Sequence, residues 1–516
     1  MTTTLQLHPG ALTLDDLQAL HGGGITLTLD PSAHAPIAAS AAVVQKAAAG
    51  DAPVYGVNTG FGKLANKRIS QGELEALQRN LIRSHSVGVG APLQPAVVRL
   101  MLALKAASLA RGFSGVRQEV VDCILAVHNA GLVPYVPSQG SVGASGDLAP
   151  LSHMTLALMG EGEMLVDGRR VPAMAELEKA GIAPLTLHAK EGLALINGTQ
   201  TSTALALHAL ISFEPVLESA LVIGALTVDA ARGSDGPFDP RIHDLRGQPG
   251  QIDVARYYRA LLAGSEIRQS HMEGDDRVQD PYCLRCQPQV VGACLDQLRH
   301  AALVLVREAN AVTDNPLVFA EDGVLVSGGN FHAEPVALAA DAMAVAIAEV
   351  GAIAERRIAM LIDAGVSRLP PFLSADAGLN SGFMIAHVTA AALASENKSL
   401  AHPASVDSLP TSANQEDHVS MATFAARRLQ AMISNVSVIL GIEWLASAQG
   451  VEFLRPLRSS SVLEQAHALL RAECGAMATD RYLAPDIEKA TALVARGALS
   501  SVFRNLEGLP TLWKPA

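Results

Sequence analysis

The strongest constraint on the fold of this chain is a set of long, alanine-rich segments in which apolar residues recur at a helical spacing. Within residues 333–363, acidic residues such as Glu334 and Asp341 interrupt an otherwise apolar sequence. This pattern predicts helices that are largely buried in a bundle of other helices. The segments that carry it are 202–230, 288–312, 333–363, 380–400, 417–448 and 485–504.

Composition supports a mainly α fold. Aromatic residues make up only 4% of the 516 residues, and alanine and leucine are abundant, which favours packed helices over a β-sandwich. The length exceeds one ordinary domain. We expect an irregular N-terminal helical domain, residues 1–200, followed by a long helical-bundle domain, residues 201–516. Shorter helices are expected at about 70–86, 93–111 and 115–131, and a small hairpin at 164–173 with its turn at Asp167-Gly168.

Charge and hydropathy exclude two classes of partner. The net charge is −12 and no run of five or more basic residues occurs, so a nucleic-acid surface is not expected. The charge-free run 192–213 is long enough to cross a bilayer, but its polar segment Asn197–Thr203 predicts a buried helix entered through a polar loop. The N-terminus shows no secretory pattern, and we expect a cytoplasmic protein.

The five cysteines are scattered and odd in number, which fits reduced thiols. Cys283 and Cys286 form a C-x-x-C that can be half of a zinc site or a redox pair. No second pair follows at a suitable spacing. We therefore predict no metal ligands from the sequence.

A glycine-rich loop, Gly140–Pro150, has the composition of a functional loop. At its centre Ala144-Ser145-Gly146 places three very small residues in a row. The Gly146 nitrogen can attack the Ala144 carbonyl carbon and close a five-membered ring. Loss of water, including the Ser145 hydroxyl, then leaves a conjugated methylene group, an electrophile that no ordinary side chain supplies. The ordinary interpretation of such a tripeptide is a turn.

The string Gly140–His153 resembles the signature of the aromatic amino-acid ammonia-lyases, a family within the fumarase/aspartase-like superfamily. The resemblance extends from about residue 50 to 450. It implies the self-made cofactor 4-methylidene-imidazol-5-one (MIO), formed from Ala144, Ser145 and Gly146 with no external cofactor. It also implies a homotetramer with shared active sites that acts on a small amino acid. The further matching strings are 55–62, 197–199, 279–287, 327–332 and 414–417.

The reaction of that family requires a base, because a weakly acidic β-proton must leave together with a poor leaving group. The resemblance indicates Tyr55, on a glycine-flanked loop, as the base, and a nearby arginine would lower the pKa of its hydroxyl. Glu416 is the rival base, since a carboxylate is ionised without any pKa shift. The sequence leaves the two open.

The remaining matches imply substrate contacts. Arg285 has the planar fork that grips a carboxylate, and Asn197 can donate to that carboxylate or to the cofactor's ring carbonyl. Tyr282 and Gln279 would support the amino group and the cofactor, and Phe331 would form a wall. Each of these residues alone has a structural interpretation, such as a surface ion pair for Arg285. Their joint occurrence in the family's order favours the site.

The pair Ser84-His85 occupies the family's selectivity position and resembles the members that act on histidine. A substrate imidazole needs hydrogen-bonding partners, which His85 and Glu416 can be. We therefore expect L-histidine to be converted to trans-urocanate and ammonia. The alternatives are a tyrosine or phenylalanine lyase, or an aminomutase that uses the same cofactor.

Three unrelated functions fit less well. A serine nucleophile elbow at Ser145 would need glycine where Asp147 stands. A phosphate-binding loop would need a following Gly-Lys-Ser/Thr. A retired lyase kept as a scaffold predicts loss of Tyr55 or of the Ala-Ser-Gly tripeptide, and both are intact.

Overall fold

The computed structural model describes residues 3–62, 66–275, 277–506, 509 and 511–513. Over these residues the protein is mainly helical, with four small two-stranded sheets, which confirms the predicted fold class. Contacts divide the chain into two compact units that each combine separate parts of the sequence. The first unit is 1–208, 302–341 and 403–427, and the second is 209–301, 342–402 and 428–516.

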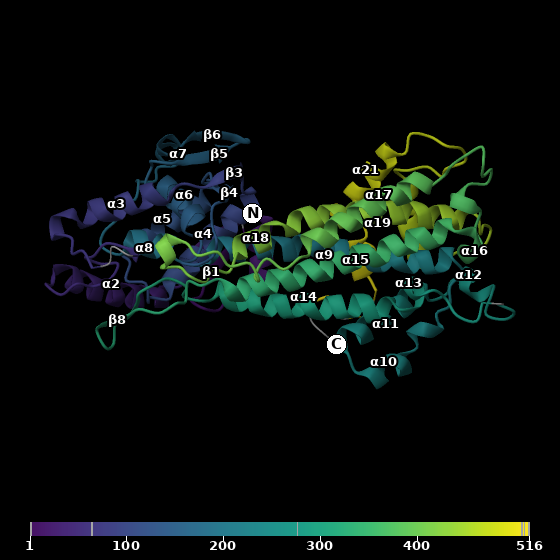
Figure 1. Ribbon diagram of the computed structural model, residues 1–516, viewed down its shortest axis with the longest axis horizontal. Coiled ribbons are helices and arrows are strands. Elements are labelled where there is room, and N and C mark those ends of the chain that lie inside the picture. Colours follow the sequence, from purple (N-terminus) through teal and green to yellow (C-terminus); the bar gives the residue numbers. More distant parts are fainter. Residues whose placement is uncertain (1–2, 63–65, 276, 507–508, 510, 514–516) are drawn as a thin grey trace. The chain divides into compact units, whose positions relative to one another are not determined.

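The first unit has short helices around a core built on α4 (Figure 1). Most of α4 is buried, because its sequence is mainly apolar, and it packs against α5 and α1. Helices α3, α6 and α8 pack against one another. The elements of this unit are β1 Thr3–Leu7, α1 Leu14–Gly22, β2 Ile25–Leu29, α2 His34–Ala49, α3 Leu74–His85, β3 Val89–Pro92, α4 Pro95–Ala110, α5 Gln118–Asn129, β4 Pro137–Gln139, α6 Leu148–Leu158, β5 Glu163–Val166, β6 Arg169–Pro172, α7 Ala173–Lys179, α8 Glu191–Ile196, β7 Leu317–Phe319, β8 Val324–Val326 and α18 Ala422–Arg427.

The sheets of the first unit are peripheral. Strands β1 and β2 are parallel, with Thr3 opposite Ile25. The other three pairs, β3–β4, β5–β6 and β7–β8, are antiparallel. The β5–β6 hairpin turns at Asp167-Gly168, where both residues have positive φ, as the turn residues predict. Its position confirms the predicted hairpin.

The second unit is a bundle of long helices. Helix α19 is buried on nearly all sides, and it packs against α17 and α21. Gly351 of α15 allows close approach, because an added β-carbon would lie 3.0 Å from Val436 of α19 (Figure 1). The elements wholly in this unit are α10 Pro240–Arg246, α11 Pro249–Leu262, α12 Glu266–Gln269, α13 Tyr282–Arg285, α16 Ala364–Ser367, α17 Met384–Leu400, α19 Leu429–Glu452, α20 Ser461–Arg471, α21 Ala484–Ala495 and α22 Ser500–Arg504. The helices that contribute residues to both units are α9 Gln200–Ala230, α14 Gln287–Ala309 and α15 Glu334–Ile362.

A buried ion pair ties this bundle together. Arg357 of α15 donates two hydrogen bonds, of 2.5 and 2.8 Å, to Glu443 of α19, and it also donates to Gln287 of α14 at 2.9 Å. Thr227 of α9 donates to the same carboxylate at 2.7 Å. Since a buried charge is costly without such partners, this network fixes how the four helices meet.

Three helical segments are long and apolar enough to cross a membrane by length and composition: Gln200–Ala230, Glu334–Ile362 and Ala422–Glu452. In the protein, 67% to 78% of their most apolar windows are buried. The expected entry of the first of these helices through a polar loop is confirmed, because α9 begins at Gln200 after Asn197-Gly198-Thr199. Burial within the bundle is therefore sufficient to account for their apolar sequences.

Candidate active site

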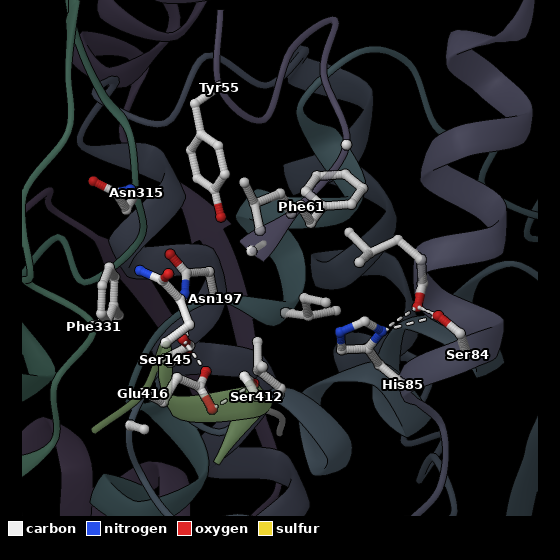
Figure 2. Close-up of a pocket in the computed structure, with 18 of the residues that line it drawn as sticks. Tyr55, Phe61, Ser84, His85, Ser145, Asn197, Asn315, Phe331, Ser412 and Glu416 are labelled. Atoms are coloured by element: carbon white, nitrogen blue, oxygen red, sulfur yellow. Dashed lines mark hydrogen bonds between the residues drawn. The ribbon is translucent and has the colours of Figure 1, made fainter. Parts of the chain in front are cut away.

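A cavity of about 1070 Å³ lies in the first unit. It brings together residues from segments that are far apart in the sequence, as Figure 2 shows. Seven of the predicted site residues line it: Tyr55, His85, Ala144, Ser145, Asn197, Phe331 and Glu416. Sequence reasoning had joined these residues only through a family resemblance, and the structure places them around one space.

Asp147 anchors the glycine-rich loop on which Ser145 lies. Its buried carboxylate accepts hydrogen bonds from the Ser202 amide at 2.7 Å and the Ser202 hydroxyl at 2.9 Å. On the other oxygen it accepts from Ser141 at 3.0 Å and Thr423 at 2.7 Å. Burial raises the pKa of Asp147, and these hydrogen bonds oppose the increase. The loop is thus held between the start of α9 and α18.

The tripeptide lies directly against a second backbone segment. Gly146 has φ +76° and pairs with Gly198 through a parallel bridge. A β-carbon at Gly146 would lie 2.3 Å from the Gly198 oxygen, so only glycine fits there. Asn197 donates from Nδ2 to the Ser145 carbonyl at 2.7 Å, and its own buried Oδ1 has no hydrogen-bond partner in the part of the chain that the structure describes. That oxygen is available to a ligand.

Lys105 is buried, and no motif in the sequence indicates a role for it. Its ammonium group donates to the carbonyl oxygens of Ala194 at 3.1 Å and Asn197 at 3.0 Å, at the C-terminal end of α8. Burial lowers the pKa of Lys105 to about 7, although the negative charges of Asp314 and Asp147 oppose this. Lys105 therefore holds the backbone on which Asn197 is presented.

Glu416 lines the cavity next to Ser145. Its carboxylate accepts hydrogen bonds from the hydroxyls of Ser145, Thr411 and Ser412, the last at 2.9 Å. Partial burial alone would raise the pKa of Glu416, but these hydrogen bonds outweigh burial and the pKa lies below its ordinary value. The group is consequently ionised at neutral pH.

His85 at the end of α3 presents a defined ring nitrogen to the cavity. Its Nδ1 lies 2.9 Å from the Leu81 carbonyl oxygen, which can only accept, and 3.0 Å from the Ser84 hydroxyl, which can donate or accept. We assign the proton to Nδ1, because otherwise two acceptors would face each other at Leu81. Burial lowers the pKa of His85, while the Leu81 carbonyl and the Glu416 charge oppose this. In the neutral ring Nε2 is then an acceptor, and Figure 2 shows that nitrogen directed into the cavity.

Tyr55, Phe331 and Asn315 complete the wall. Figure 2 shows the Tyr55 hydroxyl pointing into the cavity toward Asn197, with Phe331 to one side. Asn315 accepts from the Gly328 amide at 2.7 Å, and the preceding Asp314 forms a buried ion pair with Lys190 at 2.8 Å. Asn315 was not predicted as a site residue, because an asparagine before proline carries no signal for a binding role.

Gln279, Tyr282 and Arg285 lie in the second unit and do not line this cavity. Gln279 and Arg285 line a smaller cavity of about 330 Å³, and Tyr282 is 71% exposed. The Arg285 side chain donates to the Asp280 carbonyl at 3.0 Å and lies 4.7 Å from the centre of the Tyr282 ring. Their assignment to substrate binding stays a prediction.

Acid, tyrosine and amide groups surround one small-residue loop in a helical fold, an arrangement suited to acid–base chemistry on a small molecule. A family model for aromatic amino acid lyases matches residues 12–472. The chain belongs to the aromatic amino acid lyase family.

Individual relatives refine this picture. The chain is 61% identical to a histidine ammonia-lyase of Rhodospirillum rubrum over 503 residues, which cover 97% of this chain and 98% of that protein. The crystal structure of a histidine ammonia-lyase from Trypanosoma cruzi matches with a TM-score of 0.89 and 43% identity, covering 100% of this chain and 99% of that one. A tyrosine aminomutase from Streptomyces globisporus matches with a TM-score of 0.92 at 34% identity, covering 99% and 100%. The fold is thus shared by different reactions, and the site must distinguish them.

Proposed function

We propose that this chain is a histidine ammonia-lyase, which eliminates ammonia from L-histidine and releases trans-urocanate, the first step of histidine degradation. The observation that carries this assignment is the contact of His85 Nδ1 with the Leu81 carbonyl oxygen, which leaves Nε2 as an acceptor inside the cavity. The imidazole of histidine has an N–H to donate to it, whereas a phenyl ring would leave Nε2 unpaired. The names of the two most identical relatives described above agree with this choice.

The residues around Ser145 fit the MIO group. Gly146 has positive φ and lies against the Gly198 backbone, so only glycine, whose amide nitrogen would close the ring, fits at this position. Asn197 donates to the Ser145 carbonyl, which would become the ring carbonyl. Once formed, the group supplies an electrophilic methylidene carbon for the substrate's amine. Glu416 accepts from the Ser145 hydroxyl, the group that is lost as water when the ring matures.

In the elimination, a base takes the β-proton, the C–H electrons form the new double bond, and the C–N electrons leave with the nitrogen. Tyr55 is our candidate for the base, since its hydroxyl points into the cavity (Figure 2). Glu416 is less suited, because the hydroxyls of Thr411 and Ser412, which remain after the Ser145 hydroxyl is lost, donate to its carboxylate and lower its proton affinity. We assign Glu416 instead to binding the substrate imidazole together with His85.

The substrate carboxylate requires a cation, and in this proposal Arg285 comes from another subunit of a homotetramer. Its exposed neighbour Tyr282 and the nearby Gln279 would reach the cavity from that same subunit. Exposed apolar side chains on α14, α15 and α17, among them Leu303, Val345 and Ile385, support an association of bundle helices. We expect this assembly in the cytoplasm.

The activity is tested by following urocanate formation from L-histidine by ultraviolet absorbance, with L-tyrosine and L-phenylalanine in parallel. Tyrosine is the sharper competitor, because its hydroxyl can also donate to His85. Faster turnover of either aromatic substrate would overturn the assignment. Tyr55→Phe should lower kcat by about a hundredfold or more, as expected for loss of a general base, and a larger kcat loss in Glu416→Gln would exchange the two roles.

Shared sites are tested by mixing inactive variants. Ser145→Ala and Arg285→Ala chains, co-expressed, should recover activity, because a mixed tetramer contains sites with both intact residues. The matched control combines Ser145→Ala with Asn197→Ala, which damage the same cavity of the first unit and should show no such recovery. Mixed tetramers verified by mass that stay inactive in both pairs would refute the sharing.

A further inference from the structure

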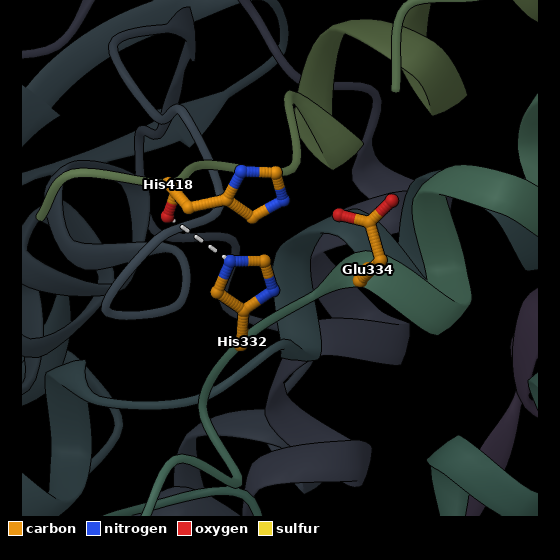
Figure 3. Close-up of side chains that lie close together, drawn as sticks. All are labelled: His332, Glu334 and His418. Carbon is orange, nitrogen blue, oxygen red and sulfur yellow. Dashed lines mark hydrogen bonds between the residues drawn. The ribbon is translucent and has the colours of Figure 1, made fainter. Parts of the chain in front are cut away.

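Three metal-ligating side chains meet beside the cavity. His332 lies just before α15, Glu334 is the first residue of that helix, and His418 lies in the loop before α18 (Figure 3). One nitrogen of each histidine and one oxygen of Glu334 all lie within 4.8 Å of one another. His332 and His418 also line the cavity. The group is separate from the residues assigned above to substrate or cofactor.

The hydrogen bond of His332 determines which of its nitrogens can bind a ligand. Its Nε2 lies 3.1 Å from the His418 carbonyl oxygen, which only accepts, so Nε2 carries a proton. In the neutral ring Nδ1 is then a lone pair, and Figure 3 shows it directed toward Glu334. A ring N–H bound to a backbone carbonyl, with the opposite nitrogen free to ligate, is the usual arrangement of a metal-binding histidine.

Glu334 supplies the second observation. Its Oε2 is buried and has no hydrogen-bond partner in the described part of the chain. A carboxylate and a neutral imidazole lone pair that face each other are both acceptors, and this is unfavourable unless a proton or a metal cation lies between them. The start of α15 stabilises the negative charge of Glu334 but provides no cation.

The three ligand atoms lie somewhat farther apart than they would around a bound metal ion. Ligand atoms on a tetrahedral Zn²⁺ are about 3.3 Å apart, given metal–nitrogen distances near 2.0 Å. The present separations of up to 4.8 Å require the side chain of His418 or Glu334 to rotate about its χ angles before a metal ion is bound. The two imidazole rings already lie parallel, with centroids 5.7 Å apart and an interplanar angle of 8°. Two imidazoles and one carboxylate select a first-row transition metal over Ca²⁺ or Mg²⁺.

We propose that His332, Glu334 and His418 bind a divalent transition-metal ion such as Zn²⁺, with the remaining coordination positions open to water. The ion would link the loop that carries Phe331 to the loop that carries Glu416, and so fix two walls of the cavity. This inference does not depend on the proposed reaction, because it rests on ligands that the reaction does not use.

The test uses the full chain without a polyhistidine tag, stripped with chelator and dialysed. Zn²⁺ binding is measured by calorimetry and by metal analysis, and Co²⁺ is used as a spectroscopic probe of the ligands. The variants are Glu334→Gln and the double variant His332→Ala/His418→Ala. The matched control is His300→Ala, an exposed histidine of α14 outside the group. Circular dichroism verifies that every variant is folded.

We expect one Zn²⁺ per chain, an affinity lowered at least about tenfold in Glu334→Gln, and loss of the ion in the double variant. The control should bind as the unaltered chain does, and Co²⁺ should show nitrogen and oxygen ligation without thiolate charge-transfer bands. A further variant, Cys283→Ser/Cys286→Ser, tests the C-x-x-C pair as the source of binding. Equal binding by all variants, or binding lost only in this cysteine variant, would overturn the proposal. So would an unaltered folded chain that takes up no ion, since a proton shared by His332 and Glu334 then satisfies the site.

Discussion

Replacement of Asp147 by alanine or by asparagine gives a sharp test of how the glycine-rich loop is held. Four donors converge on its buried carboxylate: the Ser202 amide, and the hydroxyls of Ser202, Ser141 and Thr423. The Ser202 pair binds one oxygen and the other two hydroxyls bind the second. An asparagine can keep its oxygen on the Ser202 side and turn its NH₂ toward hydroxyls that rotate to accept.

The two substitutions should therefore lower the free energy of unfolding by different amounts. In Asp147→Ala the Ser202 amide cannot find another partner, and a buried unsatisfied donor costs about 1–3 kcal/mol. The Ser202 hydroxyl still lies 3.1 Å from the Thr199 carbonyl, but the hydroxyls of Ser141 and Thr423 each lose an acceptor. Relief of the buried charge offsets part of this, and we expect a net loss near 3 kcal/mol, against about 1 kcal/mol for Asp147→Asn.

The assay is hydrogen–deuterium exchange at the Ser202 amide, together with urea unfolding followed by circular dichroism. A 3 kcal/mol loss in local stability corresponds to exchange about a hundredfold faster in Asp147→Ala. Intact mass provides a second readout, because a matured tripeptide is lighter by two water molecules. We expect this deficit to persist in Asp147→Asn and to be lost in Asp147→Ala. Equal exchange in both variants would show that the carboxylate does not hold the loop.

Three further predictions concern single residues. His85→Leu should lower kcat/KM for L-histidine by about tenfold to a hundredfold, which corresponds to the free energy of one or two buried hydrogen bonds, and should raise the ratio of phenylalanine to histidine turnover. An unchanged ratio in steady-state assays would show that His85 does not determine substrate selectivity. Lys105→Met should lower the urea midpoint more at pH 9 than at pH 6. The pKa of Lys105 is lowered to about 7 in the folded state. Above that pH the unfolded chain binds more protons than the folded one, so the stability of the unaltered protein rises with pH and the variant lacks this gain. Asp229→Asn should gain in stability relative to the unaltered protein as pH rises from 4 to 7. Burial raises the pKa of Asp229 from 3.8 to about 6, so ionisation of the folded carboxylate over this range destabilises the unaltered protein alone. Urea midpoints of the two proteins that move in parallel across this range would contradict the prediction.

Much of the helical fold follows from local sequence pattern. Apolar spacing predicted a helix at 333–363, and α15 spans Glu334–Ile362. Two of the predicted helices differ from the structure at residues with positive φ, which the apolar spacing does not reveal. The segment 417–448 divides into α18 and α19, and its first residues belong to a loop in which Met421 has φ +57°. The segment 485–504 divides at Gly497, with φ +72°.

The sequence by itself determined which chemistry the chain contains: the Ala144-Ser145-Gly146 tripeptide, the Ser84-His85 pair and the strings that resemble one family. Short motifs reveal this because their residue types and spacing are read within a few positions. Only the tertiary structure decided that Tyr55 and Glu416 face one cavity, that Ser202 and Lys105 hold the segments around it, and that Arg285 belongs to another unit. Ser202 lies 55 positions from Asp147, and Lys105 lies 92 positions from Asn197. Contacts over such separations depend on how helices pack in space, which hydrophobic periodicity does not encode.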